Sequence, residues 1–107
     1  MKTRRLELDK KLRAILQEEI GKVNIYFQPP EGFKLTYPCI VYQKDTADHM
    51  FADNKVYQFT QAYQLTYMDK NPDNTVVERI LEEFKWAKYG RNFKADNINH
   101  DVIIIYY

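Results

Sequence analysis

The fold is decided by one stretch, Val56-Tyr-Gln-Phe-Thr-Gln-Ala-Tyr-Gln-Leu-Thr-Tyr-Met-Asp69, in which large apolar and aromatic side chains alternate with polar or small ones. The alternating apolar positions are Tyr57, Phe59, Tyr63, Leu65 and Tyr67. A period of two is that of a strand with one face buried and the other open. The stretch therefore predicts one long strand whose odd-numbered side chains lie in the core.

A helix is predicted before this strand, close to the N-terminus. Its apolar residues recur every three or four positions, at Leu8, Leu12, Ile15, Leu16 and Ile20. Gly21 follows, where a left-handed residue commonly ends a helix. Basic residues crowd the start, where the helix dipole favours acids, so we expect residues 1–5 to be frayed.

A second helix is predicted after the long strand. Its apolar stripe consists of Val76, Val77, Ile80, Leu81, Phe84 and Ala87. We expect Asn71 or Asp73 to cap its start and Gly90 to end it. Four basic residues surround that expected end, at Lys85, Lys88, Arg91 and Lys94. A solvated helix terminus that complements the dipole explains most of them.

Shorter strand patterns fill the rest of the chain, at residues 23–28, 37–43, 92–95 and 102–107. The order is therefore helix, strand, strand, long strand, helix, short strand, strand. It predicts an α+β fold, with one small domain over residues 1–107. We expect a mixed, mostly antiparallel sheet with both helices packed on one face.

Residues 44–55 interrupt the strand pattern with a polar segment that carries two large apolar side chains. Long connections in small domains are uncommon unless they carry a function. The segment therefore predicts a protruding loop or hairpin that contacts another molecule. The candidate interface residues are Asp45, Asp48, His49, Met50, Phe51, Asp53 and Asn54.

Composition excludes several partners. The formal net charge of the 107 residues is +1, which gives no field strong enough to draw the molecule onto nucleic acid or anionic lipid. The longest apolar run, at residues 102–107, is far shorter than the roughly 20 residues of a membrane span, so no membrane contact is expected. The single cysteine, Cys39, excludes an internal disulfide, and its apolar neighbours predict a buried, reduced thiol.

No motif for catalysis, cofactor binding or metal binding is found. The two histidines, His49 and His100, do not share the spacing of a metal site. The chain has no serine, and its three glycines are isolated, so neither a serine nucleophile nor a phosphate-binding loop is expected. We therefore expect no catalytic, cofactor or metal residues, and no enzyme activity.

Aromatic residues make up 15% of the chain, which is typical of a tyrosine-rich sheet or a protein interface. Single-stranded nucleic acid also binds to aromatic side chains, but it requires basic residues among them. Residues 56–68 contain neither lysine nor arginine. The aromatic stripe of the long strand is therefore interpreted as core.

Five segments carry a resemblance to a known family: Pro38-Cys-Ile-Val-Tyr-Gln, Ala52-Asp-Asn-Lys, Tyr57-Gln-Phe-Thr-Gln-Ala-Tyr-Gln-Leu-Thr-Tyr, Val76-Val-Glu-Arg-Ile-Leu and Phe93-Lys-Ala-Asp-Asn-Ile-Asn-His-Asp-Val-Ile-Ile-Ile-Tyr-Tyr. Together they resemble the tail terminator proteins, also called tail completion or head-tail joining proteins, of long-tailed bacteriophages and prophages of Gram-positive bacteria. The resemblance extends over nearly the whole chain from Leu6.

The resemblance implies a structural virion protein that acts without a chemical reaction or cofactor. Such a subunit closes into a homohexameric ring on the last ring of tail-tube protein, stops tube growth and provides the surface for the head. The implied partners are other copies of the chain, the tail-tube protein and a head-completion or connector protein, with DNA only in passage. The implied location is the head-tail interface of the virion, after synthesis in the bacterial host cytoplasm.

Two other functions stay open, and an enzyme of unknown type is a third, which a bound metal or a deep polar pocket would indicate. Another head-tail connector component would share the ring arrangement but would usually be more helical. A stand-alone protein-binding or nucleic-acid-binding module would form a defined dimer or bind DNA in a salt-sensitive way.

Overall fold

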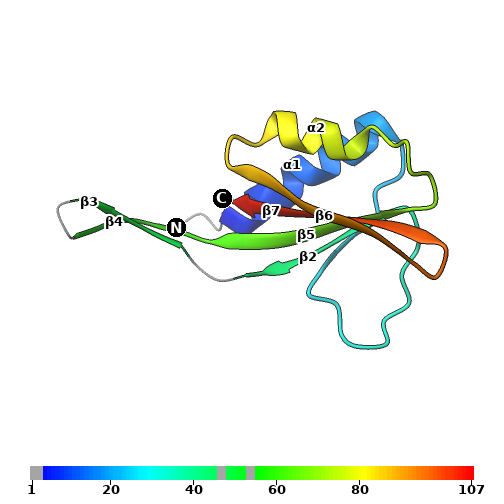
Figure 1. The fold of residues 1–107 in the computed structure, drawn as a ribbon, viewed down its shortest axis with the longest axis horizontal. Coiled ribbons are helices and arrows are strands. Elements are labelled where there is room, and N and C mark those ends of the chain that lie inside the picture. Colours follow the sequence, from blue (N-terminus) through cyan, green and yellow to red (C-terminus); the bar gives the residue numbers. More distant parts are fainter. Residues whose placement is uncertain (1–3, 46–47, 53–54) are drawn as a thin grey trace.

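The sheet of this chain has five strands and carries a separate hairpin at one end (Figure 1). The computed structural model describes residues 4–45, 48–52 and 55–107. Its elements, in chain order, are α1 (Arg4–Glu19), β1 (Ile25–Phe27), β2 (Cys39–Lys44), β3 (Asp48–Ala52), β4 (Lys55–Thr60), β5 (Ala62–Asp69), α2 (Val76–Glu83), β6 (Ala87–Ala95) and β7 (Ile98–Tyr106).

The strands of the main sheet lie in the order β1-β2-β5-β7-β6. β1 is parallel to β2, and every other neighbouring pair is antiparallel. Both helices lie on the same face of this sheet (Figure 1). The predicted α+β class and the mixed, mostly antiparallel sheet are confirmed, and β7 is an interior strand, as its β-branched sequence indicated.

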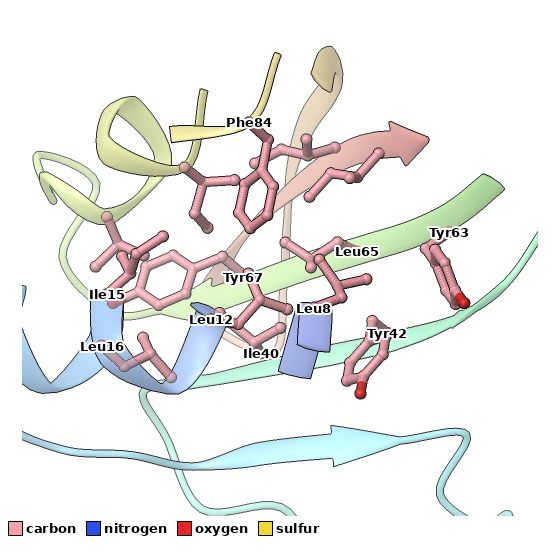
Figure 2. Packing of buried hydrophobic residues seen from close by; sticks show 14 residues of the cluster. Leu8, Leu12, Ile15, Leu16, Ile40, Tyr42, Tyr63, Leu65, Tyr67 and Phe84 are labelled. Atoms are coloured by element: carbon pink, nitrogen blue, oxygen red, sulfur yellow. The ribbon is translucent and has the colours of Figure 1, made fainter. Parts of the chain in front are cut away.

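One hydrophobic core lies between the sheet and the helices. α1 contributes Leu8, Leu12, Ile15 and Leu16, all of which are buried (Figure 2). Tyr63, Leu65 and Tyr67 of β5 face them, as the alternation predicted. The remaining buried members of this cluster are Ile40, Tyr42, Val76, Ile80, Phe84, Ile103 and Ile105.

The start of α1 differs from the expected fraying. Arg4 and Arg5 belong to the helix, and the guanidinium of Arg5 lies 4.3 Å from the ring centre of Phe27. Its Nη1 also donates a 3.2 Å hydrogen bond to the Tyr42 hydroxyl. The predicted fraying is therefore wrong for these two residues, because side-chain contacts with the sheet offset the unfavourable dipole. Residues 1–3 lie outside the described part.

The end of α1 is as predicted. Gly21 has a φ of 69°, and its N–H donates a 3.0 Å hydrogen bond to the carbonyl of Leu16. This left-handed conformation costs glycine little because it lacks a Cβ.

α2 is shorter than predicted, and both of its predicted boundaries are wrong. It ends at Glu83, because Phe84 is extended, with φ −103° and ψ 121°. Ala87 and Gly90 lie in β6, not in the helix. At the start, Thr75 is the cap residue, and Val77 N–H bonds to Asn74 Oδ1 at 3.3 Å.

The two predicted cap residues of α2 belong to the preceding turn. Asn71 N–H bonds to Asp69 Oδ1, and Asp73 N–H bonds to Asn71 Oδ1, each at 3.0 Å. Asx turns of this kind use the side chains that would otherwise cap the helix.

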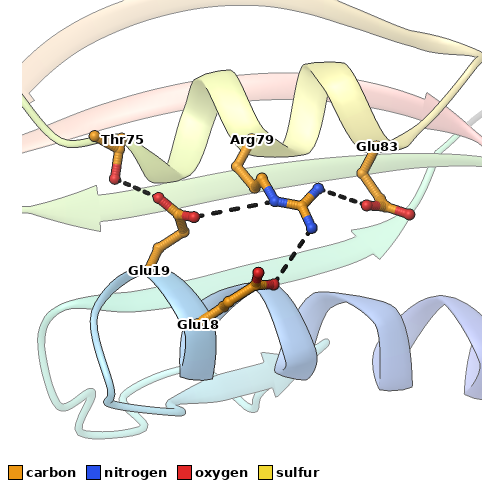
Figure 3. Close-up of polar contacts among 5 residues, drawn as sticks. All are labelled: Glu18, Glu19, Thr75, Arg79 and Glu83. Atoms are coloured by element: carbon orange, nitrogen blue, oxygen red, sulfur yellow. Dashed lines mark hydrogen bonds and ion pairs between the residues drawn. The ribbon is translucent and has the colours of Figure 1, made fainter.

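Polar contacts join the two helices on the outside of the core (Figure 3). Arg79 of α2 lies 3.3 Å from Glu18 and 4.0 Å from Glu19 of α1, and it also pairs with Glu83 in its own helix. The Thr75 hydroxyl donates a 2.6 Å hydrogen bond to Glu19 Oε1. These contacts hold the start of α2 against the end of α1.

The stretch that predicted one long strand contains two. β4 ends at Thr60 and pairs with β3, whereas β5 begins at Ala62 and pairs with β2 and β7. Gln61 separates them. The expectation that Tyr57 and Phe59 face the core concerns side chains outside the described part.

Candidate assembly surfaces

The β3–β4 hairpin projects from the end of the main sheet (Figure 1). We call its strands, residues 48–52 and 55–60, the arm. With the arm, the molecule measures 48 × 29 × 28 Å along its principal axes. The predicted protrusion at residues 44–55 is thus a hairpin, and it is longer than expected because β4 continues to Thr60.

The base of the arm is tied to the two strands that carry it. Asp45 N–H donates a 2.8 Å hydrogen bond to the carbonyl of Ala62. Nε2 of Gln61 donates to the carbonyls of Asp45 and Ala62, at 2.8 and 2.9 Å. The Gln61 carbonyl in turn accepts a 3.0 Å bond from Tyr107 N–H. The arm therefore starts from a fixed point on β2 and β5.

The predicted interface residues gather along this arm. Asp45 is exposed at the base. Asp48, His49, Met50 and Phe51 follow one another in β3, where they pair with Thr60, Phe59, Gln58 and Val56 of β4, and the register shifts between Met50 and Phe51. The other two predicted residues, Asp53 and Asn54, lie outside the described part.

A second exposed surface lies on β6, the last strand of the main sheet. The residues 88–94 are all exposed. We call residues 85–94 the basic edge, because they contain Lys85, Lys88, Arg91 and Lys94 and no acidic residue. The interpretation of these four residues as a helix terminus is wrong, because the helix ends before them and a strand begins at Ala87.

Large aromatic side chains are interspersed with the cations of the basic edge. Trp86 is 58% exposed, Tyr89 41% and Phe93 39%. The ammonium of Lys85 lies 5.3 Å from the ring centre of Trp86, and the guanidinium of Arg91 lies 5.4 Å from that of Phe93. Exposed aromatic and arginine side chains are the residue types that anchor interfaces. The sequence showed these basic residues around Trp86 and Tyr89 but not the edge strand that carries most of them, although the alternation at residues 92–95 was a signal for a strand.

A bulge at Gly90 sets which way these side chains point. The register shifts between Tyr89 and Arg91, and a Cβ at Gly90 would lie 3.0 Å from the carbonyl oxygen of Val102. Arg91 pairs with Val102 and Phe93 with His100, on the sheet face away from the helices. A side chain at this bulge would be tight, because the backbone of the neighbouring strand would have to move by a few tenths of an ångström.

Next to the basic edge, Asp101 of β7 has a buried carboxylate on the helix side of the sheet. Oδ1 of Asp101 accepts hydrogen bonds from the Tyr89 hydroxyl and from Asn92 Nδ2, each at 2.8 Å. Partial burial and the bond to Asp101 raise the pKa of Tyr89. On the other face, Phe93 stacks on His100 with ring centres 4.6 Å apart. The hydrogen bonds from Tyr89 and Asn92 occupy the carboxylate of Asp101 within the fold, and this residue is 8% exposed.

The predicted core thiol is buried. Cys39 is fully buried at the start of β2, and burial raises its pKa to about 11. In the described part of the chain, no three His, Cys, Asp or Glu side chains are grouped as metal ligands would be. His100 Nδ1 lies 3.0 Å from the carbonyl of Ile98. The expected absence of catalytic, cofactor and metal residues stays a prediction.

Among the described residues, no helix has the length and apolar character needed to cross a membrane. Comparison with known proteins finds no family model that matches the chain and no curated protein of significant sequence similarity. The arm and the basic edge are therefore the features of the molecule that bear on its function.

Proposed function

We propose that this chain is the subunit of a ring that caps the tail tube of a long-tailed bacteriophage, ends its polymerisation and provides the head-joining surface. The observation that carries the proposal is the arm, which extends the molecule to 48 Å while its base is fixed by Asp45, Gln61 and Ala62. A subunit with such an extension can reach a neighbouring copy, and heterologous contacts between copies form a ring when the rotation closes.

The two exposed surfaces support this proposal because they differ from each other. The arm lies beyond one end of the sheet, and the basic edge is the outer strand of that sheet. Rings are built by heterologous contacts, in which one patch of a subunit meets a different patch of the next. In this proposal the tube protein, the head-completion protein and other copies of the chain are the partners, the virion is the site of action, and DNA only passes through.

The basic edge supports a second candidate, a module that binds single-stranded nucleic acid. Cations interspersed with exposed aromatic rings are the residues that such binding uses. Binding of this kind weakens steeply with added salt, because counterions are released from the phosphates. A fluorescent oligonucleotide titrated at several salt concentrations distinguishes this candidate from the ring.

Tube polymerisation tests the proposed function. Tail-tube protein encoded by the same genome is polymerised with and without this protein, and tube length and labelled protein are followed by electron microscopy. We expect short tubes with the protein at one end. Tubes of unchanged length with no protein at either end would contradict the proposal.

A variant without the arm is the sharpest control for this experiment. It replaces residues 46–61 with Asn-Gly, so that a two-residue hairpin turn joins Asp45 to Ala62, which are already hydrogen-bonded. We expect it to fold but not to cap tubes. The charge change Lys34→Glu, in an exposed loop outside both surfaces, should leave capping intact.

A further inference from the structure

In the part of the chain that the structure describes, the arm stands apart from the main sheet. Its two strands form a sheet of their own, and among the described residues they are not hydrogen-bonded to the five-stranded sheet. An isolated two-stranded hairpin is at best marginally stable in water. The arm therefore gains stability when another surface covers it.

The basic edge offers the complementary surface. β6 is nine residues long and ends the sheet, so alternate backbone N–H and C=O groups along it point away from β7. The opposite edge strand, β1, has only three residues. An added strand or hairpin would therefore find its longest run of backbone partners on β6.

Charge favours the same pairing. In the sequence, the arm and its base, residues 45–60, contain three aspartates, Asp45, Asp48 and Asp53, and one cation, Lys55, which gives a formal charge of −2 (one positive and three negative charges). The basic edge has four cations and no acidic residue. Opposite charges on two surfaces steer encounter and fix orientation. Because each subunit carries both surfaces, a second copy of this chain fits the basic edge.

We infer that the arm of one subunit docks on the basic edge of a second copy, head to tail. The contact is heterologous, so it propagates until the rotation closes a ring. Its role in a ring rests on the proposed function, but the contact itself does not require a tail tube. In a closed ring, the arm of each subunit binds the basic edge of one neighbour, and its basic edge binds the arm of the other neighbour.

Two variants with one intact surface each test the contact. The first is the arm-lacking variant, and the second is the edge variant Lys88→Glu with Arg91→Glu, which reverses two exposed charges. Light scattering after size exclusion gives the mass of each alone and of their mixture. We expect the wild type to self-associate, each variant alone to be a single subunit, and the mixture to stop at a one-to-one dimer. Only a head-to-tail contact gives this result, because the mixture contains one intact arm, from the edge variant, and one intact basic edge, from the arm-lacking variant.

Two controls exclude loss of folding and a general charge effect. Circular dichroism and thermal unfolding should match the wild type for both variants. The charge-matched pair Lys22→Glu and Lys34→Glu, at exposed positions elsewhere, should self-associate like the wild type. Adding Asp48→Lys to the edge variant should restore part of the association.

Several outcomes would overturn the inference. They are a wild type that stays a single subunit at every concentration, an edge variant that associates normally, and a mixture that stays monomeric. If the edge variant associates normally but loses salt-sensitive binding to an oligonucleotide, the edge binds nucleic acid instead. If the edge variant still caps tubes, the contact is wrong but the proposed function stands. If the contact is confirmed but the protein does not cap tubes, the proposed function is wrong and the contact stands.

Discussion

The hydroxyl of Tyr42 donates a 2.6 Å hydrogen bond to Oδ2 of Asp9 and thereby joins β2 to α1. Arg5 donates to the same hydroxyl, and Asp9 also pairs with Arg13. Burial, together with the bond to Asp9, raises the pKa of Tyr42 to about 12. This chain of contacts links the helix to the strand that continues into the arm.

Replacing Tyr42 with phenylalanine tests this link. The change keeps the buried ring but leaves Asp9 without its hydroxyl donor, and we expect the free energy of unfolding to fall by about 1 to 2 kcal/mol. Urea denaturation followed by circular dichroism measures it. Tyr26→Phe is the matched control, because the Tyr26 hydroxyl accepts a bond from Thr36 N–H in an exposed loop. Equal stability of Tyr42→Phe and wild type would contradict the assignment.

Gln61 is expected to hold the base of the arm. Gln61→Ala removes the two bonds from Nε2, which should loosen the bond between Asp45 N–H and the Ala62 carbonyl. Hydrogen exchange at the Asp45 amide should therefore become faster, because local opening costs less. The amides of β7 serve as the internal control and should not change. Unaltered exchange at Asp45 would show that the side chain of Gln61 is not needed there.

Cys39 should make the folded state less stable in alkali. The thiol pKa is raised from 9.0 to about 11 in the fold, so between these values the unfolded chain loses its proton first. The unfolded state then binds fewer protons, and the free energy of unfolding falls as the pH rises through this window. Below pH 9 the contribution of the protonated thiol to the free energy of unfolding is fully present.

The variant Cys39→Ala isolates that effect. It should show a smaller loss of stability over the same pH range, in denaturation curves measured from neutral pH upward. Tyr42 and other buried tyrosines account for the slope that remains. Identical slopes for the variant and the wild type would show that the thiol does not contribute.

Salt should weaken the contact between the arm and the basic edge. Exposed charges are largely screened beyond about 8 Å at physiological ionic strength. The mass from light scattering should therefore shift toward the single subunit as sodium chloride is added. The charge-matched variant at Lys22 and Lys34 should follow the wild type. Association that strengthens with salt would indicate an apolar contact instead.

The sequence predicted best the elements whose pattern is local. The spacing of Leu8, Leu12 and Leu16 predicted α1, and the alternation of Leu65 and Tyr67 predicted the buried face of β5. Both patterns depend only on helix and strand periods.

The predictions from sequence failed where the pairing of strands decides the bounds of an element. Phe84 and Ala87 keep a helical spacing, yet the chain turns at Phe84 because residues 87–95 pair with 98–106 across the Asp96–Asn97 turn. Likewise the alternation is the same on both sides of Gln61, so only the pairing partners separate β4 from β5. The first of these errors also hid that the four basic residues near it lie on or beside an edge strand.

Light scattering after size exclusion, on the protein alone and after mixing with tail-tube protein of the same genome, tests the central claim most directly. The account predicts a ring mass, either for the protein alone or on the tubes, and its loss when the arm is removed. A stable single subunit that ignores tubes and binds DNA in a salt-dependent way would contradict it.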